Sequence, residues 1–247
     1  MKKYMLFQAI LACTISHPCY SQQDLKKNSS EIPVSTTSQN YTRKYLQFTE
    51  TKKGLILFQS ILVRTSDSVF YNGKKSRAIT QRYHMQNFID TDSSICDPLT
   101  LAPQAYYSKL NSEGYNEEVI FMPKTIHNKI VFKDTVKTSI KPNTMFLNGV
   151  VEDEIIAQLD LSQGETYKVN VVNPGLLFME YQLKISVLGK EFLEVPGFGK
   201  ILCWKLDVNS GTKNGATVWC SEKGHIQLKK TFVLPDENLF TRVLLFN

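Results

Sequence analysis

The sequence is short of several features that would mark a familiar function. Beyond its N-terminal segment it has no hydrophobic run of transmembrane length, so we expect no membrane-spanning helix in the mature chain. Its 29 basic and 23 acidic residues are interspersed, without a long block of one sign. This spread argues against a surface dedicated to nucleic acid, and we expect no nucleic-acid partner.

The motifs of common catalytic and metal sites are missing as well. There is no Gly-x-Ser-x-Gly nucleophile turn and no phosphate-binding glycine loop leading into a helix. Residues 90–94 begin like a calcium loop, but Ile95 stands where that loop needs glycine, and Leu101 where it needs a bidentate glutamate. His84, His127 and His225 share no spacing that would place two ligands on one element. The sequence therefore predicts no catalytic residue, no metal site and no cofactor.

The N-terminal segment has the form of a secretory signal. Lys2 and Lys3 precede a mostly apolar stretch at 5–14, and small residues stand before a cleavage point after Ser21. A lipoprotein signal is the competing interpretation, in which Cys13 of Ile10-Leu11-Ala12-Cys13 would carry the lipid. Because few residues separate Lys3 from Cys13, we favour a signal peptide at 1–21. The expected location is the periplasm or the medium, with a lipid anchor at Cys13 as the alternative.

The remaining chain divides into a polar leader and one folded unit. Residues 22–40 are rich in Ser, Thr, Gln and Lys and contain little that could be buried, which predicts a disordered leader. Order is expected to begin near Tyr41. Nothing marks a linker further along, so we predict a single β-rich domain over 41–247.

Short segments that are apolar or alternate with period two follow one another between turn residues. They predict strands at 54–64, 68–71, 75–89, 99–110, 115–122, 124–132, 165–172, 179–188, 190–195, 199–208, 216–222, 225–233 and 239–246, with 90–98 as a connecting turn. Apolar residues between 145 and 161 have helical spacing, with Glu152-Asp153-Glu154 as a polar face, which predicts one helix near 148–159. The predicted fold class is mainly β, a curved antiparallel sheet closing towards a barrel or half-barrel.

The hairpin at 199–222 is the most informative stretch. If its turn is centred on Gly211 and Thr212, Trp204 faces Trp219 and Cys203 faces Cys220. Leu202 and Leu206 then lie on the face of the two tryptophans. This face is expected to belong either to the ordinary core or to the wall of a ligand-binding cavity. In the second case the candidate ligand-binding residues are Trp204, Trp219, Leu202 and Leu206.

Three cysteines remain after cleavage at Ser21. Cys203 and Cys220 would be close enough in this register for a cross-strand disulfide, which an exported protein permits. The equal alternative is a pair of small apolar side chains in a sheet face. Cys96 has no partner in the sequence and is expected to be a buried free thiol.

Several short motifs suggest a family. A helix ending in Leu159-Asp160-Leu161 is followed by Gly164-Glu165-Thr166-Tyr167, and the hairpin carries Cys203-Trp204-Lys205-Leu206 and Ala216-Thr217-Val218-Trp219. The turn Asp97-Pro98-Leu99-Thr100-Leu101-Ala102-Pro103 fits the first half. Over roughly residues 41–247 the chain resembles the bacterial exported proteins of the domain of unknown function 3108 family, in versions from Bacteroidota-type bacteria, whose signals often end as Ser21-Gln22 does. The resemblance implies a secreted β-rich protein and supplies no catalytic residue.

These observations support one main hypothesis of function and two alternatives. The main one is a non-enzymatic cell-envelope protein that binds a lipid or other hydrophobic ligand in a β groove or cavity. One alternative is a hydrolase-type enzyme whose site is assembled only in the fold. The other is a structural envelope component that pairs an exposed edge strand with a partner protein.

Overall fold

The computed structural model describes residues 40–144, 146–174, 178–195, 197–211 and 215–245. The predicted signal peptide at 1–21, with Cys13, and the predicted leader up to residue 39 lie outside the described residues. The first described element, strand β1, begins at Tyr41.

The described strands form one sheet of fifteen, in the order β8-β7-β6-β5-β4-β3-β2-β1-β15-β14-β13-β12-β11-β10-β9. The first half contains β1 (Tyr41–Glu50), β2 (Ile56–Tyr71), β3 (Lys74–His84), β4 (Ile89–Cys96), β5 (Pro103–Leu110), β6 (Tyr115–Phe121), β7 (Thr125–Phe132) and β8 (Thr135–Pro142). The second half contains β9 (Leu147–Asn148), β10 (Thr166–Asn173), β11 (Met179–Val195), β12 (Gly199–Asn209), β13 (Ala216–Ser221), β14 (Gln227–Val233) and β15 (Leu239–Leu245).

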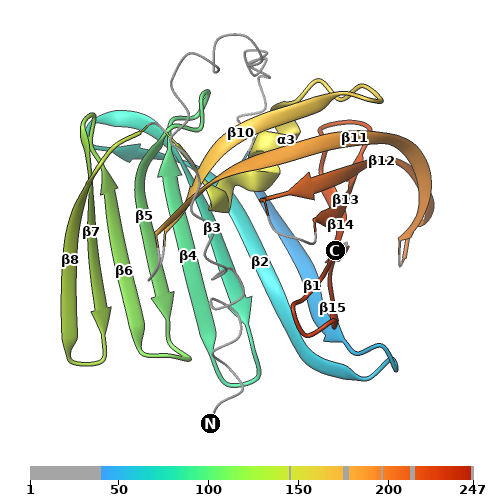
Figure 1. The fold of residues 1–247 in the computed structure, drawn as a ribbon, viewed down its shortest axis with the longest axis horizontal. Coiled ribbons are helices and arrows are strands. Elements are labelled where there is room, and N and C mark those ends of the chain that lie inside the picture. The colour runs from blue at the N-terminus through green and yellow to red at the C-terminus, as the bar shows by residue number, and fades with distance from the viewer. Residues whose placement is uncertain (1–39, 145, 175–177, 196, 212–214, 246–247) are drawn as a thin grey trace.

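The sheet is a succession of antiparallel neighbours whose two ends stay apart. Each described strand pairs antiparallel with the next along the sheet, except that β9 runs parallel to β10. Figure 1 shows the sheet curling so that β10 and β11 pass over the helix that lies on the inner side of β2 and β3. The predicted fold class is thus confirmed: over the described residues the protein is mainly β, with a curved sheet and one short helix.

The helix fills the inside of the curl. A 3-10 turn, η1 (Gly149–Val151), leads into α3 (Glu152–Gln158), which agrees with the predicted helix near 148–159. The Asn148 side chain accepts a hydrogen bond from the Val150 N–H (2.9 Å) and so caps the first turn. Because a helix this short is not stable alone, it depends on the packing of its apolar residues.

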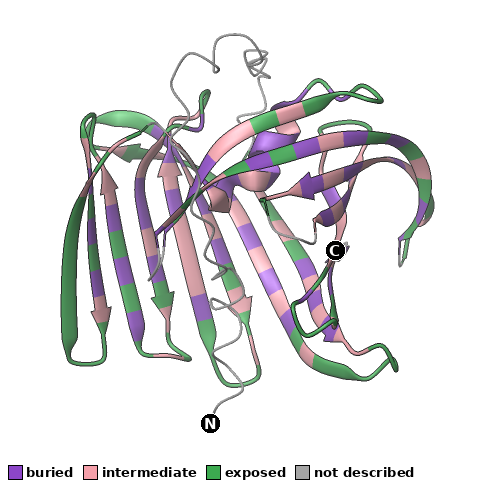
Figure 2. Ribbon diagram, viewed as in Figure 1, coloured by how far each residue is buried: buried purple, intermediate pink, exposed green. Residues whose placement is uncertain are grey.

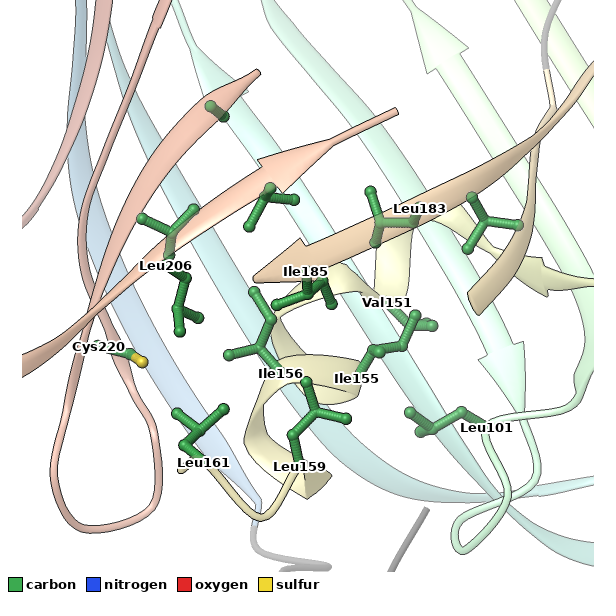
Figure 3. Close-up of a cluster of buried hydrophobic side chains, with 14 of the residues drawn as sticks. Leu101, Val151, Ile155, Ile156, Leu159, Leu161, Leu183, Ile185, Leu206 and Cys220 are labelled. Atoms are coloured by element: carbon green, nitrogen blue, oxygen red, sulfur yellow. The ribbon is translucent and has the colours of Figure 1, made fainter. Parts of the chain in front are cut away.

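The main core lies between the helix and both halves of the sheet. Val151, Ile155 and Ile156 are almost fully buried and pack with side chains of the N-terminal and C-terminal strands (Figure 3). Those partners include Ile79 on β3 and Ile185 on β11. Each such aliphatic side chain contributes about 1.5–3 kcal/mol when removed from water. The helix therefore acts as a wedge inside the curled sheet: its buried side chains pack against both halves of the sheet and hold them together.

Several parts of the N-terminal half differ from the sequence prediction. The strands predicted at 54–64 and 68–71 are one strand, β2. Residues 41–50 and 135–142, for which no strand was predicted, form β1 and β8. The predicted turn at 90–98 was wrong, because residues 89–96 form β4 between β3 and β5. Two of its inward polar side chains have partners: Asp90 accepts from the Ser112 hydroxyl (2.6 Å), and Asp92 from the Tyr106 hydroxyl (3.0 Å). Such partners allow a polar segment to become an interior strand.

Candidate functional site

The hairpin of β12 and β13 has a register one residue away from the predicted one. Trp204 lies opposite Cys220, Lys205 opposite Trp219, and Cys203 opposite Ser221. Since a shift of one residue reverses the face of a strand, the two tryptophans lie on opposite faces of the sheet. The predicted Trp204–Trp219 and Cys203–Cys220 pairs were therefore wrong.

The structure has Cys96, Cys203 and Cys220 as free, buried thiols. Cys220 belongs to the core around the helix, whereas Cys203 belongs to a second cluster with Leu193 and Val195. Burial raises the pKa of Cys203 to about 11 and the pKa of Cys96 and Cys220 to about 12. The thiols therefore stay protonated at neutral pH and fill apolar positions, as the alternative interpretation of the sequence had it.

Trp219 packs against the second cluster and is also held by polar groups. Its indole Nε1–H donates to Glu191 Oε1 (2.5 Å), and the ammonium groups of Lys205 and Lys229 lie 5.7 Å and 5.4 Å from the ring centroid. The hydrogen bond from Trp219 is the main cause that lowers the pKa of Glu191, aided by the ammonium group of Lys205. These contacts fix the ring as part of a charged cluster.

The other three candidate residues do share one face of β12. Leu206 is fully buried in the core around α3. Trp204, nearer the start of the strand, is half-buried and packs against the same core, and Leu202 is half-buried beyond it. Leu202 lies opposite Phe192 on β11, whose side chain is 68% exposed, and Trp204 lies opposite Lys190. We call Lys190, Phe192, Leu202 and Trp204 the hairpin face.

The hairpin face combines apolar surface with charge. The Lys190 ammonium lies 4.6 Å from the Trp204 ring centroid and 2.5 Å from Glu222 Oε1. Glu194 of β11 lies opposite Lys200 of β12, closer to the turn that joins these two strands. Phe192 and Leu202 thus present hydrocarbon between two groups of charged side chains. This pattern of apolar surface bounded by polar groups is typical of sites that bind amphiphiles or other proteins.

A buried ionic network, which sequence reasoning missed, anchors the helix. Arg64 on β2 is 1% exposed, and its guanidinium contacts the carboxylates of Glu154 and Asp153, the latter at 3.5 Å. It also donates to the Val150 carbonyl (2.9 Å) and to the Tyr41 hydroxyl (3.2 Å). The Tyr41 hydroxyl in turn donates to Glu154. The predicted polar face at 152–154 is therefore mostly directed into the protein, where it meets its counter-ion.

Strands from the far half of the sheet complete this network. Gln227 on β14 donates to Asp153 Oδ1 (3.0 Å), and Lys230 forms an ion pair with Glu152 (2.5 Å). Burial alone would raise the pKa of Asp153, but Arg64, Arg242 and Lys230 hold it below its ordinary value. The ionised network therefore ties α3 to strands from both halves. Its central groups are shielded from solvent, which favours a structural role over contact with a substrate.

A groove of about 390 Å³ lies on the outer face of β4–β7. The side chains on this face alternate with the buried inner residues of the same strands. They are Thr91, Ser93, Tyr107, Lys109, Asn116, Glu118, Lys129 and Val131. None of the predicted ligand-binding residues lines it.

Two general features bear on the kind of site. Among the described residues, no group of three or more His, Cys, Asp or Glu side chains is placed to hold a metal ion. In the same part of the chain, no helix combines the length and apolar character needed to cross a membrane.

The fold and these surfaces define a mainly β protein with an open, curled sheet and a wedged helix. Residues 41–235 match a family described as "Protein of unknown function (DUF3108)". The chain belongs to this family, as the motifs around the C-terminal hairpin suggested. A comparison with curated proteins found no match.

Proposed function

We propose that this protein is exported to the cell envelope and binds a hydrophobic ligand of the lipid class on the hairpin face, without catalysing a reaction. Export is supported by the signal-like sequence at 1–21. Binding is supported by a single structural observation: Phe192, which is 68% exposed, lies on one face of β11 and β12 with the half-buried Leu202 and Trp204.

The charges around this surface suit an amphiphile. Hydrocarbon placed along Phe192 and Leu202 loses its contact with water, which is the main gain in free energy. The half-exposed ammonium of Lys190 stands at one end of the strip and can contact a polar or anionic headgroup, although Glu222 shares it. The strip is open, so the ligand would lie against the sheet. The buried carboxylates of the ionic network do not reach this surface.

The two tryptophans allow a direct binding assay. In a Trp219→Phe variant, Trp204 is the only tryptophan, so its emission reports on the hairpin face alone. We expect palmitate, below its micelle concentration, to shift this emission to shorter wavelength. Lysophosphatidylcholine, which has a zwitterionic headgroup, tests how much the lysine contributes to binding.

Phe192→Ser should weaken binding by about tenfold or more, since burying a phenylalanine side chain contributes about 1.5–3 kcal/mol. Phe70→Ser is the matched control, because Phe70 is 84% exposed and lies on β2, outside the hairpin face. Equal affinities for the two variants, or no response of Trp204 to either lipid, would reject the proposed binding surface.

Export is tested separately by the intact mass of the protein recovered from its own host. A chain beginning at Gln22 supports a freely exported protein. A diacylated or triacylated chain beginning at Cys13 would make it a lipid-anchored protein, and an uncleaved chain inside the cell would contradict export.

A further inference from the structure

Strand β8 is an open edge of the sheet. It pairs with β7 on one side and is the last strand in the order, so its other side has no strand beside it in the described part of the chain. Figure 2 shows β8 exposed over nearly its whole length, and only Lys141 is half-buried. At the other end of the sheet, β9 has two residues and passes directly into the helix. The long free edge is therefore β8.

An edge strand of this kind offers ready backbone partners. Alternate residues of β8 direct both their N–H and C=O groups away from β7, where a further strand could accept and donate hydrogen bonds. Pro142, which has no N–H, stands at the end of the strand and does not interrupt this row. The backbone geometry provides affinity for any extended chain, and selectivity must come from the side chains.

The two faces of β8 differ in character. Val136 and Ile140 are 59% and 66% exposed and share one face with Thr138; Val136 lies opposite Val131 of β7. Lys137 and Lys141 lie on the other face, because side chains alternate along a strand. The Lys141 ammonium lies 4.3 Å from the Phe178 ring centroid, and Lys137 is exposed. An added strand would thus meet apolar side chains on one face and cations on the other.

We propose that β8 binds an extended segment of a partner protein, which adds a further strand to the sheet and alternates apolar with acidic residues. Opposite-charge and apolar cross-strand pairs each contribute about 0.2–1 kcal/mol, so the alternation determines which segment binds best. Pairing through an exposed edge is a known mode of peptide recognition. This inference does not depend on the hairpin face, which lies at the opposite half of the sheet.

A second copy of the chain fits this edge less well. In a symmetric antiparallel pair centred on Ser139, Lys137 of one copy would face Lys141 of the other. Centring the pair on Thr138 places Val136 opposite Ile140, but it leaves the lysines of both copies diagonal to one another on one face. The edge carries no acidic residue to balance them. Like charges across strands are destabilising, so the charge pattern favours a different, acidic partner.

The test uses synthetic peptides and the full exported chain. The first peptide alternates Val and Glu, the second has the same composition with Val and Glu in separate blocks, and the third has Lys in place of Glu. We expect the alternating acidic peptide to bind at least tenfold more tightly than either of the others. Its affinity should fall as salt is added, because the charges involved are exposed.

A charge reversal then tests the face that makes the contact. Lys137→Glu combined with Lys141→Glu should reverse the preference towards the alternating Lys peptide. Lys109→Glu combined with Lys129→Glu is the matched control, since it makes the same change of charge on the outer face of β5 and β7. The control variant should keep the original preference, and Phe192→Ser should have no effect on peptide binding.

Backbone N-methylation separates strand addition from simple charge attraction. Methyl groups on one alternate set of peptide nitrogens should abolish binding, whereas methyl groups on the other set should be tolerated, because only one set faces β8. Equal binding of the alternating and block peptides, or insensitivity to both methylated sets, would overturn the proposal. It would also be overturned if the chain formed dimers that the β8 charge reversal alters, since the occupant would then be a second copy.

Discussion

Replacing Arg64 by methionine should destabilise helix α3, which holds the two halves of the curled sheet together. Arg64 supplies the positive charge between Asp153 and Glu154, and it also binds the Val150 carbonyl at the start of the helix. The methionine side chain fills much of the same volume without a charge. Two carboxylates would then share a site from which water is largely excluded.

The expected loss in free energy of unfolding is about 3–5 kcal/mol, because removing one partner of a buried ion pair leaves an uncompensated charge. Loss of the arginine hydrogen bonds to Val150 and Tyr41 places the change towards the upper end of that range. Urea unfolding followed by far-ultraviolet circular dichroism measures it, with the midpoint compared at constant slope.

Two further variants make this prediction specific. Adding Asp153→Asn and Glu154→Gln to Arg64→Met removes the stranded charges, so the triple variant should be more stable than Arg64→Met alone. Lys52→Met, which breaks an exposed ion pair with Glu237, should leave the midpoint unchanged within error. An unchanged midpoint for Arg64→Met, or a triple variant less stable than the single one, would refute the anchoring role of the network.

Three other predictions follow from burial. Leu206→Ala should lower the free energy of unfolding by about 2–5 kcal/mol, while Trp204→Ala should lower it less, since Trp204 is only half-buried; urea midpoints compare them. Burial lowers the pKa of His225 below its ordinary value of 6.5. The stability gained by keeping this imidazole neutral is therefore fully present above pH 6.5, and it is lost as the pH falls towards the lower pKa of the folded state. A His225→Gln variant should show a flatter fall in stability across that range. A thiol reagent should react slowly at pH 7 in the native chain and fast in urea at the described cysteines, namely Cys96, Cys203 and Cys220; fast labelling of the native chain would contradict their burial.

Regular hydrophobic patterns were sufficient to predict the helix and most of the C-terminal strands. The helix at 149–158 follows from its apolar spacing, and β12 follows from alternation. Strand β11 is a single strand where two, at 179–188 and 190–195, were predicted. Strand β4 could not be recognised because Asp90 and Asp92 are typical turn residues. Only their tertiary partners Ser112 and Tyr106 make them acceptable in the interior. Strand β8 was missed for a different reason: it has no buried face to produce a pattern.

The candidate site shows where residue-level prediction ends. The segments forming the hairpin of β12 and β13 were identified correctly, yet its register was wrong by one residue, which placed Trp219 on the wrong face. The position of the turn centre decides that register, and the sequence between the strands is compatible with either of the two registers. The ionic network depends on Arg64 meeting residues about ninety positions away. A single charged residue at the end of an apolar strand was the only local sign of it.

The pairing of β1 with β15 places the two described ends of the chain side by side in the middle of the sheet. The chain emerges from its N-terminal side first, both during synthesis and during export, so β1 keeps one edge unpaired until β15 has emerged. The most central seam of the sheet is thus the last that can form, and it closes over one of the longest sequence separations in the molecule. Until then the N-terminal strands have a second open edge beside β1, and this temporary edge is where a chaperone would protect the nascent chain best.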